Sequence, residues 1–532
     1  MNSFKPMLLT SLKSYDRAQF AKDVTAGIIV AIIALPLSIA LALASGVGPE
    51  AGIFTAIVAG FVISALGGSC VQIAGPTAAF ATIVAGIVAR DGLEGLMTAT
   101  ILAGVFLILM GFCHFGSLIK FIPYTITTGF TSGIAVTIVI GQLKDFCGIT
   151  YPDGVKPIET MEKLKAFAEN FSTISPDALI VGGVSLAILI VSPLIFKKIP
   201  GSLIAVIAGI LMVQFLPLHV STIGNLYTIS NALPTLHLPV FDMKLIQSAI
   251  PNAFTIAVLA AIESLLSCVV ADGMINSKHR SDTELIAQGA GNIASALFGG
   301  IPATGAIART AANIKNGGRT PVAGMVHSIT LVIVLVVLMP FAGMIPMPTI
   351  AAILFLVAYN MCQWRTFVHL VRTAPKSDII VLFTTFVLTV VFDLVVAIEI
   401  GMVLACLLFI KRMSEETHAD SWVYVDDDSP AVDEHLQKLP LEIRVYEITG
   451  PLFFGAADAI EHIVVKDFTK CLVLRMRSVP AIDSTAMNAL QNLTKLCESK
   501  GITLVFSHVN EQPMKVMKKS GFVELVGEEN FC

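Results

Sequence analysis

Two apolar segments of the sequence, Ala74–Val88 (AGPTAAFATIVAGIV) and Ala303–Ile314 (ATGAIARTAANI), are interrupted at their starts by helix-breaking residues. The first break is Gly75-Pro76-Thr77, and the second is the run Gly299-Gly-Ile-Pro302. Interrupted apolar segments at corresponding positions in two halves of a chain are typical of substrate sites in secondary transporters. What the pair indicates therefore depends on where the two segments fall among the others.

The composition separates the chain into a membrane part and a polar part. Of the 532 residues, 55% are hydrophobic and only 14% are charged, and the mean hydropathy is +0.82. Soluble globular chains carry about 25% charged residues. Charges are scarce as far as Arg412 and return to the density of a soluble protein from Ser414 onward. We therefore expect a cytoplasmic N-terminal segment at 1–22, a transmembrane domain at 23–412, a linker at 413–439 and a cytoplasmic domain at 440–532.

The uninterrupted apolar runs, from Val24–Ser45 to Val395–Ile410, join the interrupted pair to make about fourteen membrane segments. An even number of segments puts both termini on one side of the membrane. The basic residues gather in the loops of that side, which the positive-inside rule assigns to the cytoplasm. The interrupted segments are the third and the tenth, so they match in two halves of seven. An odd number of segments per half makes the two halves inverted relative to each other.

The chemistry of the breaks favours an anion site. Each break starts a short helix inside the bilayer, and the first turn of a helix has unpaired N–H groups and a partial positive charge. Two such helix starts facing each other can bind an anion with few charged side chains. Pro76 and Thr77 suit a helix start, because proline gives up an N–H that would lack a partner and threonine can cap. The alternative is that these residues only kink membrane helices.

Two ionisable residues lie inside the apolar segments. Glu263 is the only charged residue in Ala253–Val270, and a carboxylate at such depth is costly unless it is paired or protonated. We expect it to couple transport to a proton or a cation; the alternative is a hydrogen bond between helices. Arg309 lies about one helical turn beyond Gly305 and could supply a fixed positive charge for an anion. The alternative is a side chain that reaches the cytoplasmic boundary.

The polar part alternates strand-like runs with helix-like ones, which predicts an α/β domain of about 90 residues. Its run Ala481-Ile-Asp-Ser-Thr485 places Asp483 and Ser484 at the start of a helix, where an Asp or Ser cap is expected.

The charge and the cysteine spacing argue against nucleic-acid binding, a metal site and a disulfide framework. The net charge is -4 and there is no basic stripe, so we expect no binding to nucleic acid. The nine cysteines are scattered and show no metal-ligand spacing. We therefore expect neither a metal site nor a disulfide framework.

Four motifs, in order and at matching spacing, are familiar as a set. They are Ala34–Gly52 in the first span, Gln72–Ala78 in the third segment, Ala261–Leu266 in the eighth span and Gly299–Thr310 in the tenth segment. From about Phe20 to Glu524 the sequence resembles the sulfate-permease (SulP) family of anion transporters. Over Ala303–Met413 it is most similar to the enterobacterial C4-dicarboxylate transporters of that family.

The resemblance implies a polytopic helical domain with a seven-plus-seven inverted repeat, divided into core and gate domains. It also implies an anion held between segments three and ten and lined by the first span, elevator-like alternating access, and a homodimer. Carried over by motif, the substrate-binding residues would be Pro36, Leu37, Leu41, Thr77, Ala78, Phe80, Thr304, Gly305, Ala306, Ile307 and Arg309. Glu263 would be the coupling residue.

Two departures from the family pattern bear on these expectations. Animal members often have glutamine and an aromatic residue where this chain has Leu37 and Leu41, so contacts from those two side chains would differ. The sodium-coupled bicarbonate branch tends to carry aspartate where this chain has Glu263. This favours H⁺ as the coupling ion, with Na⁺ as the alternative and with no other cofactor.

The polar domain resembles a STAS domain, as found in anti-sigma-factor antagonists, where the serine that matches Ser484 is phosphorylated. A phosphate at a helix N-terminus would be stabilised by the helix dipole. The resemblance implies a regulatory role for Ser484 and a cytoplasmic protein partner for this domain. The alternative is that this serine belongs only to a helix cap.

These expectations together describe a proton-coupled importer of a small anion in the bacterial inner membrane, with no enzymatic activity. Sulfate, bicarbonate and C4-dicarboxylates such as succinate remain open as substrates. The alternatives are an uncoupled anion channel, a membrane sensor that signals through the STAS domain, a sodium-coupled bicarbonate transporter, and a nucleobase permease on the same fold.

Overall fold

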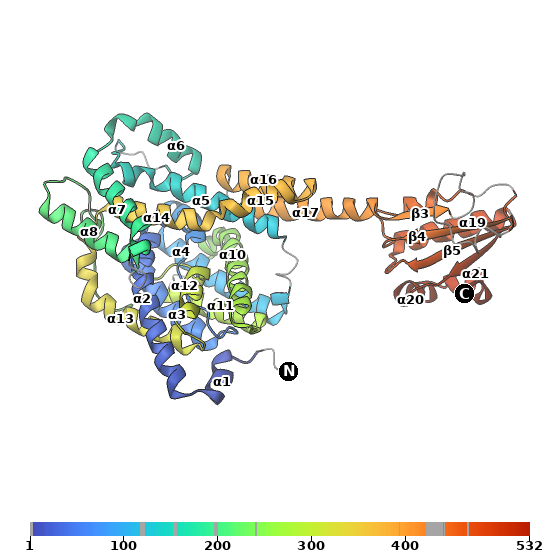
Figure 1. The fold of residues 1–532 in the computed structure, drawn as a ribbon, viewed down its shortest axis with the longest axis horizontal. Helices are drawn as coiled ribbons and strands as arrows, with labels where there is room; N and C mark the ends of the chain where they lie inside the picture. Colours follow the sequence, from blue (N-terminus) through green and yellow to red (C-terminus); the bar gives the residue numbers. More distant parts are fainter. Residues whose placement is uncertain are drawn as a thin grey trace. The chain divides into compact units, whose positions relative to one another are not determined.

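The computed structural model describes residues 4–117, 123–152, 157–195, 200–239, 242–392, 394–421, 440, 442–464 and 468–532. They form two compact units, Met1–Met402 and Val403–Cys532. The first unit is helical and the second contains a four-stranded sheet (Figure 1). Most of the predicted linker, residues 422–439, lies outside the described residues.

The first unit is built from helices of very different lengths. In chain order they are α1 (Met7–Ser11), α2 (Arg17–Ala44), α3 (Pro49–Leu66), α4 (Ala81–Phe112), α5 (Tyr124–Cys147), α6 (Thr160–Glu169), α7 (Pro176–Ile195), α8 (Gly201–Phe215), α9 (Ile223–Leu226), α10 (Met243–Ile275), α11 (Ser281–Leu297), α12 (Ile307–Lys315), α13 (Val322–Ala342), α14 (Met347–Cys362), α15 (Trp364–Thr373), α16 (Lys376–Val391) and α17 (Leu394–Glu415), the last of which ends in the second unit. Two strands of two residues each, β1 (Ala74–Gly75) and β2 (Thr304–Gly305), lie among them.

Among the described residues, eight helical stretches are long and apolar enough to cross a membrane alone. They contain α2, α3, α4, α5, α7, α10, α13 and the pair α14–α15. The helices α8, α11, α12 and α16 are shorter. With these and α17 included, and with α4 counted as two segments, the order of segments agrees with the predicted fourteen.

The double count of α4 rests on Gly92. This residue has φ 71° and ψ -169° in the middle of the helix, a conformation that only glycine adopts readily. It separates residues 81–91 from 93–112. The sequence predicted Ala74–Val88 as the third segment and Leu93–Phe112 as the fourth, and the kink at Gly92 falls between them.

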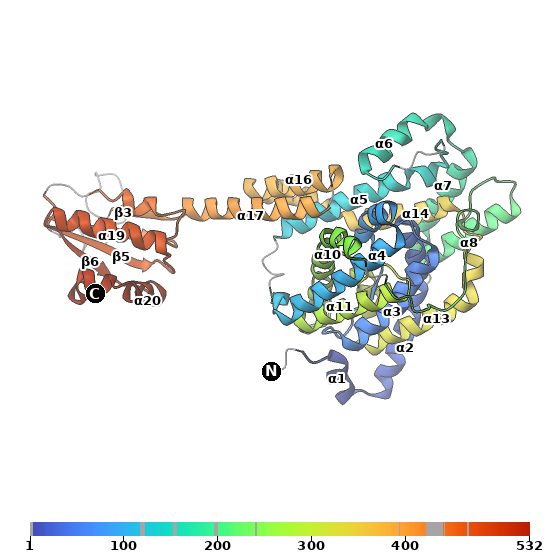
Figure 2. The same cartoon turned by 180° about the vertical axis from the view of Figure 1, so that it is seen from behind.

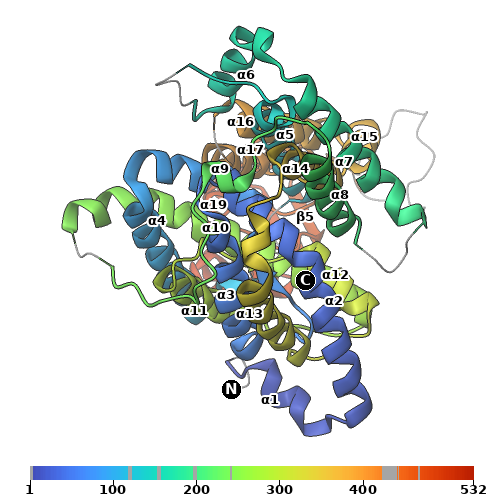
Figure 3. The same cartoon turned by 90° about the vertical axis from the view of Figure 1, so that its left-hand side faces the viewer.

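The helices of the first unit pack in two groups. In one group α4 packs on α10 and α11, while α3 contacts α11 and α13 and α2 packs on α13. In the other, α14 packs on α5 and α7, and α16 packs on α5. Figures 2 and 3 show the two groups side by side, and they correspond to the core and gate domains that the resemblance implies.

The second unit contains β3 (His418–Ser421), β4 (Ile443–Thr449), β5 (Cys471–Ser478) and β6 (Thr503–Ser507) in that spatial order. β3 is antiparallel to β4, whereas β4, β5 and β6 are parallel. The helices are α18 (Asp458–Glu461), α19 (Ser484–Ser499), α20 (Glu511–Lys519) and α21 (Phe522–Val526). Ile448, Leu474 and Phe506 from the sheet pack with Leu490 and Phe522 in one apolar core. The α/β prediction for this domain is confirmed.

Candidate anion-binding site

The two interrupted segments meet at β1 and β2. These strands are antiparallel, with Ala74 opposite Gly305 and Gly75 opposite Thr304. Just beyond the pair, Ala306 N donates to Ile73 O at 2.9 Å. The breaks in the third and tenth segments, more than 200 residues apart in the chain, are thus joined by backbone hydrogen bonds.

A helix starts directly after each strand. After β1 the chain passes Thr77 into a 3-10 turn, Ala78–Phe80, and then into α4. After β2 it passes Ala306 into α12. No side chain caps either start among the described contacts, so first-turn N–H groups remain available as donors to an anion.

Thr77 does not cap its helix, as the sequence had predicted, but contacts Glu263. Its Oγ1 donates to Oε2 of Glu263 at 3.0 Å. The capping expectation was wrong: the hydroxyl is directed at the carboxylate on α10, and no first-turn N–H among the described contacts donates to it. The predicted coupling residue and a predicted binding residue are therefore in direct contact.

The residue after Glu263 ties α10 to the second strand. Ser264 Oγ lies 2.7 Å from Thr304 Oγ1 and accepts from Gly305 N at 3.0 Å. Ser264 was not among the predicted site residues. Its place beside Glu263 in the eighth-span motif was the only available indication.

Arg309 is buried beside the paired strands β1 and β2, with 3% of its surface exposed. Its Nη2 donates to Ser38 Oγ of α2 at 3.3 Å, while Nη1 has no hydrogen-bond partner in the described part of the chain. A Cβ at Gly75 would collide with Nη1, so the guanidinium lies directly against the β1 backbone. None of the ion pairs in the described part of the chain involves Arg309. Its burial against α2 and β1 does not fit the alternative of a side chain that reaches the membrane boundary.

The predicted substrate-binding residues divide by exposure. Leu37, Thr77 and Ala306 are half-buried, and Ile307 is 42% exposed. The buried set comprises Pro36, Leu41, Ala78, Phe80, Thr304, Gly305 and Arg309. The four residues that are not buried lie at the two helix starts and on α2. Thr304, Gly305 and Arg309 are buried behind the helix starts.

Buried polar side chains that the sequence analysis did not single out satisfy the backbone around the strands. Thr310 Oγ1 accepts from Ile73 N at 3.0 Å, and Asn313 Nδ2 donates to Val71 O at 2.9 Å. Asn292 contacts both backbone groups of Ala303, at 2.8 and 2.9 Å. Non-helical backbone at membrane depth needs such partners. Polar residues inside apolar segments were the available indication, but hydropathy does not say what they contact.

In the second unit, Ser484 is exposed at the first position of α19. The cap is Asp483, whose Oδ1 accepts from Thr485 N and Ala486 N, both at 2.9 Å. Its Oδ2 accepts from Phe454 N at 2.9 Å. The capping role therefore belongs to the aspartate, and the serine lies accessible beside it.

Comparisons with known proteins agree with this architecture. A family model described as the sulfate permease family matches residues 20–385, and a STAS domain model matches residues 438–531. YvdB of Bacillus subtilis is 38% identical over 524 residues, which cover 98% of this chain and 97% of that protein. The bicarbonate transporter BicA of Picosynechococcus is 34% identical over 488 residues, which cover 88% of this chain and 85% of BicA.

A solved structure shares the fold. The murine Solute Carrier 26 family member A9 anion transporter, in its inward-facing state, matches with a TM-score of 0.87 at 18% sequence identity. The match covers 98% of this chain and 92% of that one. The chain belongs to the sulfate permease family of membrane transporters and carries a STAS domain after its membrane part.

Proposed function

We propose that this protein is a secondary active transporter that moves a small anion across the bacterial inner membrane and couples that movement to a cation at Glu263. The observation that carries the proposal is the 3.0 Å contact between Thr77 and Glu263. It places an acid at the start of one of the two helices that would hold the anion.

The contact supplies a physical reason for coupling. An ionised Glu263 repels an anion and competes with it for the positive end of the helix that follows Thr77. A proton or a Na⁺ on this carboxylate removes the repulsion, so cation and anion bind more tightly together than apart. Because such coupling is reciprocal, an inward cation gradient can drive accumulation of the anion.

Arg309 supplies the selectivity for negative charge. Its guanidinium is buried against β1 and Nη1 has no partner among the described residues. An unpaired buried cation is costly, and an anion at the adjacent helix starts would lower that cost. A neutral substrate such as a nucleobase would leave the charge uncompensated.

The relatives narrow the substrate class. The matching family is named for sulfate, and BicA is named as a bicarbonate transporter. We therefore propose sulfate or bicarbonate as the first substrates to test, with C4-dicarboxylates as competitors. We propose H⁺ as the coupling ion, since this chain carries the longer and more basic glutamate at position 263.

The remaining features that the family resemblance implies belong to the same proposal. They are elevator-like movement of the group of helices that contains the site, assembly as a homodimer, and a cytoplasmic position for both termini. The exposed Ser484 fits a regulatory contact between the STAS domain and a cytoplasmic protein.

Uptake into proteoliposomes tests the proposal. Labelled sulfate and bicarbonate are offered in turn, with succinate, nitrate and chloride as competitors and with pH and sodium gradients imposed separately. We expect accumulation of sulfate or bicarbonate above its equilibrium level under an inward H⁺ gradient. Accumulation that needs a Na⁺ gradient would replace H⁺ by Na⁺ at Glu263. Flux that only dissipates the anion gradient under every condition would identify a channel and contradict the proposal.

A further inference from the structure

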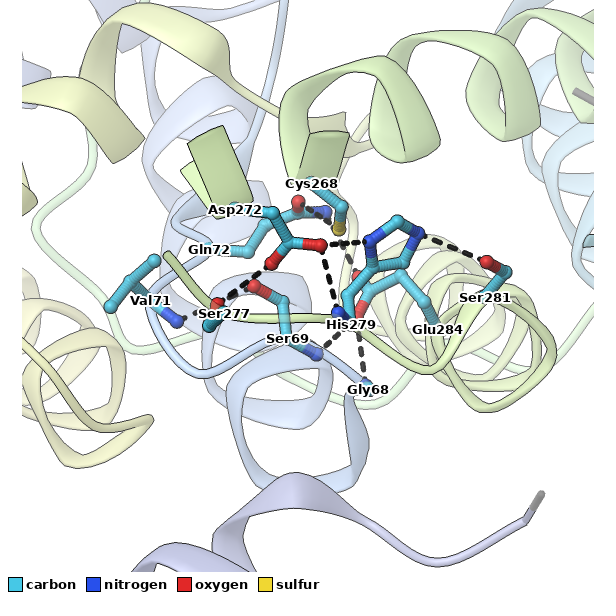
Figure 4. A network of polar contacts seen from close by, with 10 residues as sticks. All are labelled: Gly68, Ser69, Val71, Gln72, Cys268, Asp272, Ser277, His279, Ser281 and Glu284. Carbon is cyan, nitrogen blue, oxygen red and sulfur yellow. Dashed lines mark hydrogen bonds and ion pairs between the residues drawn. The ribbon is translucent and has the colours of Figure 1, made fainter. Parts of the chain in front are cut away.

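A second buried carboxylate, Glu284 of α11, has surroundings unlike those of Glu263. It is fully buried and accepts four hydrogen bonds, three of them from residues drawn in Figure 4. Oε2 accepts from the backbone N–H groups of Gly68 at 2.8 Å and Ser69 at 3.2 Å. Oε1 accepts from Nε2 of Gln72 at 2.9 Å and Nε2 of Gln288 at 2.8 Å. Because all four partners donate, only an acceptor with several lone pairs fits this place.

Gln72 connects Glu284 with the paired strands β1 and β2. It is 5% exposed, and its Oε1 accepts from Cys268 Sγ of α10 at 2.7 Å. Its amide also lies against Gly305 of β2, where a Cβ would collide with it. One side chain therefore touches Glu284, the helix that carries Glu263, and one of the paired strands.

The backbone before β1 is held from a second direction as well. Gly68 O accepts from Arg280 N at 3.0 Å, and a Cβ at Gly68 would collide with Arg280 O. The loop that contains Arg280 is itself fixed by Asp272, which accepts from His279 N at 2.8 Å, His279 Nδ1 at 2.7 Å and Ser277 Oγ at 2.8 Å (Figure 4). The chain that enters β1 is thus positioned by the turn between α10 and α11.

We propose that Glu284 is a positioning residue for the anion site, which sets through Gln72 where β1 and β2 cross and therefore where the two helix starts point. The proposal rests on the proposed function in one respect, that the helix starts bind an anion. A glutamine at position 284 would turn an NH₂ group toward two of the four donors. Leaving buried donors unpaired is costly, and the strands would shift to relieve it.

Three variants of the full chain separate the steps of this argument. E284Q removes the charge and two acceptor positions. Q72M removes the link to β2 and leaves the backbone contacts of Glu284 in place. The double variant Q72E/E284Q exchanges the carboxylate and the amide, so the pair again presents one of each.

Asp23 provides a matched control. It is also a fully buried carboxylate, and it accepts from Tyr15 Oη at 2.9 Å, Gln19 Nε2 at 2.9 Å, Arg319 N at 2.9 Å and Thr320 Oγ1. None of its described contacts reaches β1 or β2. D23N therefore tests the loss of a buried carboxylate in the same unit without disturbing the pairing of β1 with β2.

The measurements are equilibrium binding of labelled sulfate and bicarbonate, the KM and maximal rate of uptake, and the Tm of the protein without anion. We expect E284Q and Q72M to weaken binding and raise KM by about tenfold, equivalent to one or two lost hydrogen bonds, with the maximal rate within about threefold. D23N should lower Tm but keep its affinity for the anion. The double variant should recover part of the affinity lost in E284Q.

Wild-type affinity in Q72M, or a double variant that binds no better than E284Q, would overturn the proposal. So would a loss of affinity in D23N equal to that in E284Q. If the wild-type protein bound neither anion, the proposed function would fail, and amide hydrogen exchange would still test the positioning role. Residues 68–75 should then exchange faster in E284Q than in D23N, and equal exchange in the two variants would contradict it.

Discussion

At the scale of single residues, Arg309 carries a charge that the fold buries without an acidic partner among the described ion pairs. If this charge attracts the anion, R309K should keep part of the affinity, because the charge remains while the planar fork is lost. R309Q should lose about tenfold or more, the effect of removing a buried charge near an anion. Labelled-anion binding to the two purified variants measures this. Equal affinities in R309K and R309Q would show that the charge does not act on the anion.

A substitution at Gly75 tests whether the position of the Arg309 guanidinium against β1 matters for anion binding. A Cβ at this position collides with Arg309 Nη1, the end of a flexible side chain. G75A should therefore displace the guanidinium and weaken anion binding while the protein still folds. Gly86 is the control, because a Cβ there meets no atom within 4 Å, and G86A should bind as the wild type does. A G75A protein with unchanged affinity would separate Arg309 from the site.

Residue roles at the site could be predicted only in part. The sequence placed Glu263 in the site because a lone acid stands out in an apolar helix, and its motif did the same for Thr77. It could not show that the two touch, nor that Thr77 gives its hydroxyl to Glu263 in place of a cap. Gln72 and Glu284 were missed because their importance lies in four contacts across distant segments. No local pattern records such contacts.

At the scale of elements, the kink at Gly92 divides the third segment from the fourth. With φ 71° and ψ -169°, this position would strain any residue that has a side chain, at a cost of about 1–3 kcal/mol. G92A should lower the Tm of the purified protein. G86A, in the regular part of the same helix, should leave the Tm unchanged or raise it, since alanine favours the helix. A G92A protein as stable as G86A would mean that the kink is not needed.

In the STAS domain, α19 buries Cys497 against the sheet. Burial, and to a lesser degree the charge of Glu498, raises the pKa of the Cys497 thiol to about 11. A raised pKa leaves the thiol protonated below that value, so roughly one molecule in a thousand is a thiolate at pH 8. Cys497 should therefore react with maleimide far more slowly than the exposed Cys532, as peptide mass spectrometry of the full chain can measure. Comparable rates in the native protein would contradict this packing of α19.

Most elements could be predicted because each has a local cause. Apolar runs of membrane length gave the spans, and the alternation of strand-like with helix-like runs gave the α/β domain. The paired strands β1 and β2 could not be predicted as strands, because two residues each carry no periodicity and their partners lie far apart in the chain. The amphipathic helix α6 was also missed. It begins with a capping box formed by Glu159 and Glu162, in a polar stretch between two apolar runs.

At the scale of the whole molecule, the two halves of the membrane unit pack on each other through their helices, and β1 pairs with β2 where the interrupted segments meet. The order and spacing of the segments predicted that the two interruptions lie together, because matched interruptions in inverted halves converge near the middle of the membrane. Substrate identity was not predictable, because the backbone N–H groups that we propose hold the anion suit many anions.

Coupling of the anion to a cation at Glu263 is tested directly by one variant. E263Q keeps a hydrogen-bonding group of the same size beside Thr77 but cannot take up or release a proton. In proteoliposomes with an imposed inward H⁺ gradient, wild-type protein should accumulate labelled sulfate or bicarbonate. E263Q should exchange the anion across the membrane without accumulating it, while E50Q, a carboxylate change in the first turn of α3, should accumulate it normally. Gradient-driven accumulation by E263Q at the wild-type level would contradict the account.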